Sequence, residues 1–387
     1  MDTVYLDNAA TTQMRDEVIF RMTEIMKISF GNPSSTHSYG RQSKSIIETC
    51  RKSIASHFKV SASEIVFTSG GTEADNLILR SAVRDLGVQE IITSKIEHHA
   101  ILHTVEVLEK EFGINVKYVN IKPDGHIDYA HFEQLLNSKS KQLLNSKSKQ
   151  LVSLMHINNE IGNKLDITKV ADLCKRNKAL FHSDTVQSVG HYQIDLENIP
   201  VDFIAASAHK FHGPKGVGFA FIRKNSGIKG SIFGGEQERG YRAGTEAIHN
   251  IVGLDEALKL SYKNLETERS SILDIKTYFI KKLQDVFPEV AFNGSCTDLE
   301  NSTYTLINVC LPIAAEKASL LQFQLDLKGI ACSKGSACQS GSSQNSHVLS
   351  QILNDEHLMR PSVRFSFSIF NTRADVDYVI EVLKEFV

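Results

Sequence analysis

The sequence predicts an α/β protein: a large, mostly parallel sheet covered by helices, followed by a smaller α/β region towards the C-terminus. Three observations support this prediction. Strand-like and helix-like segments alternate through the first half, a long helical stretch follows, and short strands and helices mix beyond it. The chain has 387 residues, 41% hydrophobic and 23% charged, which is enough for a substantial core and more than one domain.

The alternating segments are short apolar runs, typical of buried strands, separated by longer stretches of helical periodicity. In such a sheet, ligands gather at the carboxyl ends of the strands. We expect strands over 64–68, 90–93, 116–119, 151–155, 179–182 and 201–206, and helices over 73–86, 100–111 and 167–178.

A long helical stretch is predicted over 246–285, where Ile251, Leu254 and Leu258 recur at helical spacing. Beyond it we expect strands over 304–309 and 362–366 and helices over 318–327 and 374–386. We therefore predict a large domain over 14–255 and a small domain formed by 1–13 and 256–387.

Bulk composition disfavours several classes of protein. The net charge of -2 gives no electrostatic reason for binding nucleic acid or an acidic membrane. No apolar run approaches the roughly 20 residues of a membrane helix. The N-terminus lacks the features of a signal peptide, so we expect a cytoplasmic location.

The cysteines are scattered and form no CxxC pair, which disfavours a disulfide framework and a zinc site. For most of them we expect the role of a small buried hydrophobic residue. They are Cys50, Cys174, Cys296, Cys310, Cys332 and Cys338.

Lys210 directly follows a predicted strand and precedes a glycine-rich segment, 213–216. A lysine at such a position can lose part of its hydration, which lowers the pKa of its ammonium and suits it to Schiff-base chemistry. This interpretation predicts three further features: a carboxylate, a ring to stack on a heterocycle, and a phosphate site.

The segment 69–73, Ser-Gly-Gly-Thr-Glu, lies between a predicted strand and a helix. Backbone N–H groups at a helix N-terminus beside small residues, here Gly71 and Thr72, can bind a phosphate. An ordinary turn is the alternative. The segment is neither a Walker loop nor GxGxxG, so a dinucleotide is disfavoured.

Asp184 and Gln187 follow another predicted strand. A buried aspartate requires a cationic partner, and a protonated pyridine nitrogen is one. The alternative is a helix N-cap. His98 and His99 follow a third strand, where a neutral imidazole could lie on a heterocycle or move protons; a solvent-exposed histidine is the alternative.

Lysine, aspartate, histidine and phosphate site together are the parts that a pyridoxal phosphate enzyme requires. The sequence also resembles, nearly from end to end, the cysteine desulfurases of the NifS/IscS type, in the class V aminotransferase family of fold-type I pyridoxal phosphate enzymes. The matching motifs are YLDNAATT (5–12), GNPSSTH (31–37), TSGGTE (68–73), EH (97–98), MHINNEIG (155–162), DTVQ (184–187), SAHK (207–210), RGYRAGT (239–245), GSAC (335–338) and VRFS (363–366).

The resemblance implies a fold-type I architecture with a mostly parallel seven-stranded sheet, and it implies specific roles. Lys210 would form the Schiff base and move the substrate proton, and Arg364 would bind the substrate carboxylate. Asn8 and Asn158 would contact substrate, Asn158 also the cofactor. His98, rather than His99, would stack on the ring and carry protons. The implied cofactor-binding residues are Gly71, Thr72, His98, Asn158, Asp184, Gln187, Ser207, His209, Lys210 and, reaching the phosphate of a partner subunit, Thr245.

Cys338 lies in a segment rich in Gly and Ser, which predicts mobility. By the resemblance it attacks the sulfur of L-cysteine, becomes a persulfide while L-alanine leaves, and delivers the sulfur to an acceptor such as an iron–sulfur scaffold or a tRNA-thiolation pathway. The resemblance further implies a homodimer with shared active sites, no metal, and no direct contact with nucleic acid or membrane.

Three residues depart from the pattern common in the family: Lys334, Gln339 and Glu236. None removes a catalytic group, but they leave loop mobility, acceptor choice and the shape of the shared phosphate site open. The chain also contains an exact tandem duplication, 135–142 and 143–150, whose second copy we expect to extend a surface helix or loop.

Alternatives stay open from the sequence. A selenocysteine lyase or an aminotransferase could use the same cofactor, although an aminotransferase has no need of Cys338. A non-catalytic relative would be expected to lack Lys210 or Cys338. A dedicated metal-binding or nucleic-acid-binding protein is disfavoured, because the sequence contains neither metal-ligand spacing nor a basic patch.

Overall fold

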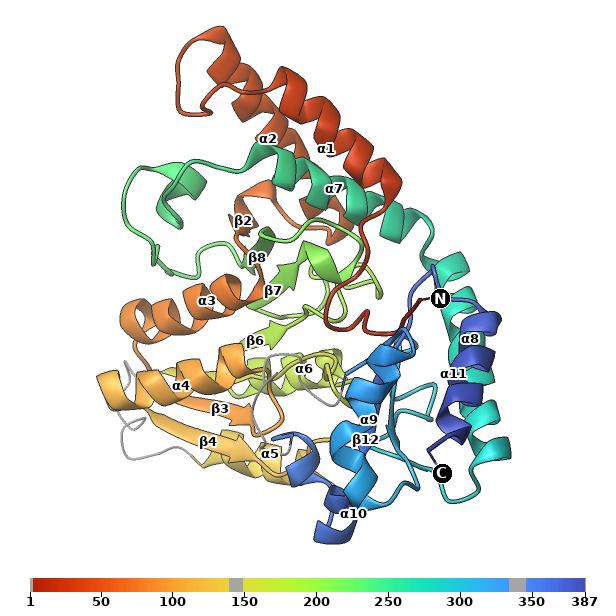
Figure 1. The fold of residues 1–387 in the computed structure, drawn as a ribbon. Coiled ribbons are helices and arrows are strands. Elements are labelled where there is room, and N and C mark those ends of the chain that lie inside the picture. The colour runs from red at the N-terminus through yellow and green to blue at the C-terminus, as the bar shows by residue number, and fades with distance from the viewer. Residues whose placement is uncertain (1–2, 139–148, 334–345, 387) are drawn as a thin grey trace.

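The computed structural model describes residues 3–138, 149–333 and 346–386, and Figure 1 shows their arrangement. The larger part is built on a seven-stranded sheet of order β2-β8-β7-β6-β5-β3-β4. Every pairing is parallel except those of β8, which runs antiparallel to β2 and β7. The strands are β2 (Ile65–Thr68), β3 (Val88–Ser94), β4 (Asn115–Val119), β5 (Lys149–Ser153), β6 (Leu180–Asp184), β7 (Phe203–Ser207) and β8 (Gly218–Ile222). The predicted mostly parallel, seven-stranded sheet is confirmed.

Helices cover both faces of this sheet, because successive strand residues point to opposite faces and both sets are apolar. Ile65 and Phe67 of β2 belong to one core, whereas Val66 between them belongs to the other. Helices α3 (Gly71–Leu86) and α4 (His99–Phe112) pack on the Val66 face. The opposite face holds α1 (Asp16–Ile28), α2 (Ser38–His57), α5 (Tyr129–Asn137), α6 (Ile167–Arg176) and α7 (Ile248–Lys263).

A second core joins the two ends of the chain. Val4 and Leu6 pack in the same cluster as Phe279 and Phe365. Here β1 (Val4–Tyr5) pairs in parallel with β11 (Ile330–Ala331). Antiparallel strands of order β12-β10-β9 form a separate sheet. The remaining elements are α8 (Leu265–Val286), β9 (Ala291–Phe292), β10 (Leu306–Cys310), α9 (Ala315–Leu327), α10 (Asp355–Met359), β12 (Ser362–Ser366) and α11 (Arg373–Lys384). The domain limits 14–255, 1–13 and 256–387 stay a prediction.

The long helical stretch predicted over 246–285 is two helices, α7 and α8, separated at Asn264. The break has a packing reason. Leu254 and Leu258 of α7 lie in the core of the large sheet, whereas Ile272 and Phe279 of α8 lie in the second core. One straight helix could not bury both sets, and asparagine readily leaves helical geometry through local hydrogen bonds.

The tandem duplication does not lie wholly in a surface helix or loop. The first copy includes the end of α5, where Leu136 is buried, and the last two residues of the second copy begin β5. There Gln150 pairs with Glu90 of β3, and its side-chain amide donates to the Glu90 carboxylate over 2.7 Å. The expectation was therefore wrong for 149–150, which lie in a strand of the large sheet; 139–148 lie outside the described part of the chain. Among the helices described, none is both long and apolar enough to cross a membrane.

Candidate active site

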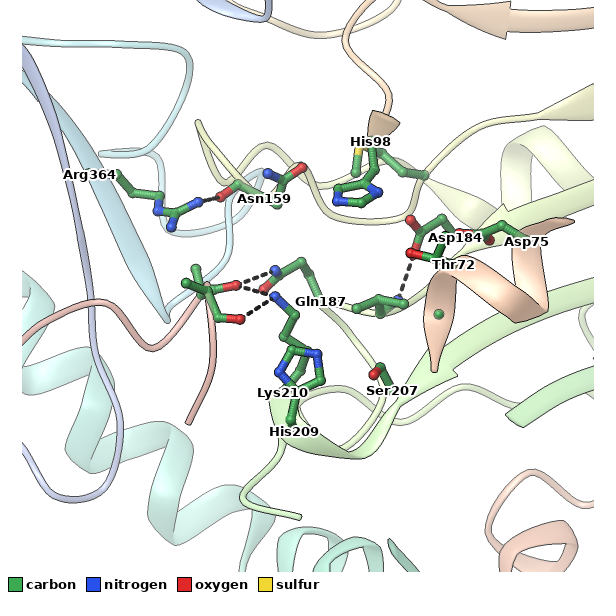
Figure 2. Close-up of a pocket in the computed structure, with 15 residues that line it drawn as sticks. Thr72, Asp75, His98, Asn159, Asp184, Gln187, Ser207, His209, Lys210 and Arg364 are labelled. Carbon is green, nitrogen blue, oxygen red and sulfur yellow. Dashed lines mark hydrogen bonds between the residues drawn. The ribbon is translucent and has the colours of Figure 1, made fainter. Parts of the chain in front are cut away.

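A pocket of about 230 Å³ lies where the carboxyl ends of the large sheet's strands meet the second core. This is the expected place for a ligand in a parallel sheet. Strand β2 leads to the start of α3, β6 ends at Asp184, and β7 ends at Ser207. The lining residues are Ala9, Ala10, Gly71, Thr72, Asp75, His98, Met155, Asn159, Asp184, Val186, Gln187, Ser207, His209, Lys210 and Arg364 (Figure 2).

The Lys210 side chain points into this pocket from the short 3-10 helix Ala208–Lys210 that follows β7. Its Nζ donates to the carbonyl oxygens of Ala9 and Ala10 over 2.6 and 2.8 Å. The Gln187 amide also donates to the Ala9 carbonyl, over 2.9 Å. The N-terminal segment thus helps to fix the amine and the amide on one side of the cavity.

The start of α3 forms a cradle suited to a phosphate. The first N–H groups of any α-helix have no carbonyl partner within the helix. A Cβ added to Gly71 would lie only 2.6 Å from Cγ2 of Val186, so a larger residue would intrude here. The side chains of Thr72, Ser207 and His209 also line the pocket (Figure 2). Small residues, N–H groups and hydroxyls together suit a bound phosphate.

Asp184 brings a buried carboxylate to the pocket. Its Oδ1 accepts a hydrogen bond of 2.9 Å from the backbone N–H of Val186. Burial raises the pKa of this carboxyl, while the Val186 N–H and the nearby Lys210 ammonium oppose the rise. A protonated ring nitrogen would supply the cation that a buried carboxylate requires.

His98 presents an imidazole to the same cavity, whereas His99 does not line it. The ring caps α4, because Nδ1 accepts from the backbone N–H of Ala100 over 3.1 Å. Burial lowers the pKa of His98 to about 4, helped by the Lys210 ammonium and the imidazoles of His99 and His347. The ring is therefore neutral at pH 7, and its proton lies on Nε2 because Nδ1 accepts from Ala100.

We expect the His98 imidazole of the cofactor-free protein to titrate near pH 4, because only strong acid offsets its burial and its cationic neighbours. The measurement is the NMR shift of its ring proton against pH, assigned by loss of the signal in His98→Gln. In the urea-unfolded protein the same signal should titrate near the ordinary histidine value of about 6.5. A folded-state midpoint at that ordinary value would contradict a neutral, buried ring.

Arg364 lies on β12, in the part of the chain built on the second core, and lines the pocket. Its guanidinium is 1% exposed, forms an ion pair of 2.8 Å with Asp7, and donates to the backbone carbonyl of Asn159 over 2.7 Å. A guanidinium held from two sides is pre-organised for a carboxylate.

Some predicted site residues lie elsewhere. The Asn8 amide is buried against the carbonyl of Ser366, at 2.8 Å, and does not line the pocket. Asn158 lines a neighbouring cavity of about 40 Å³. Its Oδ1 accepts from the N–H groups of Glu160 and Ile161 in its own loop, and its amide donates to the Ile96 carbonyl over 2.8 Å. Thr245 is exposed on a loop outside the pocket. Cys338 lies outside the described residues.

Sequence reasoning missed two polar residues that the pocket includes, Asn159 and Asp75. Asn159 and Asn158 are neighbours in one loop, and nothing in the sequence tells which of them faces the ligand. Asp75 did leave a signal. It is an acid on the same helical stretch as Ala74, Leu77 and Ile78, all of which are buried.

The five described cysteines are buried and free: Cys50, Cys174, Cys296, Cys310 and Cys332. Burial raises the pKa of Cys50 and of Cys332 to about 12 and raises those of the other three. None of these five is thus a ready nucleophile at neutral pH.

The model of the aminotransferase class-V family matches residues 4–379 of this chain. The chain belongs to this family. A class-V relative from Bacillus subtilis (strain 168), named putative cysteine desulfurase IscS 1, is 39% identical over 99% of both chains.

Two solved structures extend the likeness. A structure titled "NIFS-LIKE PROTEIN" has a TM-score of 0.88 and 33% identity over 99% of each chain. One titled "SspA in complex with cysteine" has a TM-score of 0.80 and 29% identity over 96% of this chain and 100% of that one. These agree with a fold-type I architecture.

Proposed function

We propose that this protein is a pyridoxal phosphate-dependent cysteine desulfurase. It takes sulfur from L-cysteine, releases L-alanine, and passes the sulfur through a persulfide on Cys338 to an acceptor protein. The observation that carries the proposal is the convergence, in one cavity, of Lys210, Asp184, His98, Arg364 and the phosphate cradle at the start of α3.

The pocket fits pyridoxal phosphate in three respects. Asp184 offers a carboxylate for a ring nitrogen, the start of α3 offers N–H groups for a phosphate, and Lys210 offers an amine for an aldehyde. Gln187 is placed to bind a ring oxygen. When bound, this cofactor supplies a Schiff base and an electron sink that stabilises negative charge on the substrate's α-carbon.

The remaining chemistry belongs to the chain's own residues. Arg364 binds the substrate carboxylate, and Lys210 Nζ moves the proton of the α-carbon. The neutral His98 ring, which bears its proton on Nε2 because Nδ1 accepts from Ala100, donates a hydrogen bond to the substrate sulfur. The Cys338 thiolate then forms an S–S bond with the substrate sulfur as the substrate C–S bond breaks. The electron pair of that bond stays on the β-carbon, which takes up the proton released from the substrate thiol, so the products are L-alanine and a persulfide.

Residues on either side of 334–345 support the role of Cys338. Ser333 donates to Asp7 over 2.8 Å, and its backbone pairs with Arg364. On the other side, the His347 ring lies 2.9 Å from the Glu97 carbonyl, one residue before His98. The described residues that flank 334–345 thus lie beside Arg364 on one side and Glu97 on the other.

The proposal includes a homodimer in which Thr245 reaches the phosphate site of the partner subunit. Large apolar side chains are exposed near Thr245 and on α1: Phe233 is 83% exposed and Phe20 is 66% exposed. Exposed apolar side chains that gather into one patch are typical of an interface, and we expect these two to contribute to one. Self-association would bury them and bring Thr245 to a second copy.

Phe233→Asp is expected to shift the protein from dimer towards monomer, because a charge would have to be buried against apolar surface. Sedimentation velocity over a range of protein concentrations measures this. Phe323→Asp is the matched control, since Phe323 is also exposed, at 61%, but lies on α9 far from α1 (Figure 1). Dimers of equal strength in both variants would contradict the proposed interface.

The function is tested with purified protein, pyridoxal phosphate, L-cysteine and a thiol reductant. We expect L-alanine and sulfide in equal amounts. A selenocysteine lyase would release selenide from L-selenocysteine and no sulfide, and an aminotransferase would consume a 2-oxo acid. Either of these results, or no yellow colour after incubation with the cofactor, would contradict the proposal.

A further inference from the structure

Behind Asp184 lies a chain of three buried polar side chains that the proposed chemistry does not use. Asp75 belongs to α3, His182 to β6 and Ser153 to β5. The Asp75 Oδ1 lies 3.3 Å from His182 Nε2, and the other ring nitrogen lies 2.9 Å from the Ser153 hydroxyl oxygen. Their exposures are 1%, 0% and 1%. Figure 2 shows Asp75 next to Asp184 at one end of the pocket.

Burial determines the protonation states of the ionisable side chains in this group of three. It lowers the pKa of His182 to about 3, so the imidazole is neutral at pH 7. It also raises the pKa of Asp75, and the carboxylates of Asp184 and Glu97 raise it further. Among the described residues neither Asp75 Oδ1 nor His182 Nε2 has another hydrogen-bond partner, so a protonated Asp75 can donate a hydrogen bond to the neutral ring, whose other nitrogen then donates to Ser153.

If Asp75 and Asp184 together hold one proton, the two carboxyl groups do not hold it equally well. Two neighbouring buried carboxyls do not both ionise readily. Asp184 has a backbone N–H donor from Val186 and the Lys210 ammonium, both of which favour its charged form. No such favourable contribution acts on Asp75, whose neighbouring charges are negative.

We propose that Asp75 is a positioning residue for the cofactor. Its carboxyl, which lies beside His182, keeps the proton of the pair, so that the single negative charge stays on Asp184 where a pyridine nitrogen would meet it. A charge spread over both carboxyls would lie partly out of reach of that nitrogen. This inference rests on the proposed binding of pyridoxal phosphate.

The test compares wild type, Asp75→Asn and Asp75→Ala as cofactor-free proteins titrated with pyridoxal phosphate. The asparagine keeps the size, the neutrality and an N–H donor of the protonated acid, whereas alanine leaves Asp184 and His182 without their neighbour. We expect Asp75→Ala to weaken cofactor binding by about tenfold or more, as is typical when a group that holds a ligating side chain is removed. Asp75→Asn should restore most of this loss.

The visible absorbance of the bound cofactor, followed against pH, gives a second readout. If Asp75 is neutral, the pH midpoint of the cofactor absorbance in Asp75→Asn stays near that of wild type. If Asp75 carries charge, removing it lowers the midpoint, because a nearby anion stabilises the protonated Schiff base. Melting curves of the cofactor-free proteins show whether each variant is folded.

The inference is supported by the order wild type, asparagine, then alanine in affinity, together with an unshifted midpoint for the asparagine variant. Any other order, or a lowered midpoint in Asp75→Asn, overturns it. Should Asp75→Ala fail to fold, the isosteric Asp75→Asn and its midpoint still decide. If the wild-type protein binds no pyridoxal phosphate, the proposed function fails instead, so the two failures are distinguishable.

Discussion

Lys210→Ala is expected to lose covalent attachment of pyridoxal phosphate and at least about a thousandfold in turnover of L-cysteine. Lys210 Nζ is the amine that points into the cavity, fixed by the carbonyls of Ala9 and Ala10 at 2.6 and 2.8 Å. Alanine removes both the Schiff-base amine and the base for the α-proton. Borohydride reduction followed by mass spectrometry measures attachment, and L-alanine formation measures turnover.

Lys215→Ala is the matched control for this change. Lys215 lies in the same glycine-rich segment but is exposed and does not line the pocket. It should retain both attachment and turnover. Cofactor that remains covalently bound in Lys210→Ala, on another lysine, would contradict the assignment of the amine.

Cys338→Ala is expected to keep the colour and affinity of bound pyridoxal phosphate and to lose nearly all sulfide release, by about a thousandfold or more. The proposed chemistry gives this thiol no part in binding the cofactor; it only receives the sulfur. Absorbance titration and sulfide assay on the same preparation separate the two effects.

Cys332→Ala serves as the control for Cys338→Ala, because Cys332 is near in sequence but buried, with its pKa raised to about 12. Its turnover should follow that of the wild-type protein. If Cys332→Ala loses sulfide release while Cys338→Ala retains it, the account of the nucleophile is wrong.

Much of the fold could be predicted because buried parallel strands are short apolar runs and the helices between them are periodic. The predicted strand 362–366 is observed without change as β12. The helices α1 and α2 were not anticipated, although Val18, Met22 and Ile25 form a buried stripe on α1. Ile19 and Phe20 between these positions are apolar yet exposed, which blurs the stripe, and periodicity over one short helix is a weak signal.

The parts of the site that follow strands were predictable, because each side chain's position depends on where its strand ends. Lys210, Asp184 and His98 line one pocket. Local sequence does not encode which of Asn158 and Asn159 faces that pocket, since the turn of the loop decides it. The contact of Asp75 with His182 depends on packing between α3 and β6, which periodicity does not reveal.

The most direct test of the central claim is to map sulfur on the protein after a single turnover. The protein with pyridoxal phosphate is mixed with L-cysteine labelled with radioactive sulfur, alkylated, digested and analysed by mass spectrometry. We predict that the peptide containing Cys338 gains one labelled sulfur atom as a persulfide, in step with L-alanine formation. L-Alanine formed with the label on a different cysteine, or with no labelled peptide, would contradict the account.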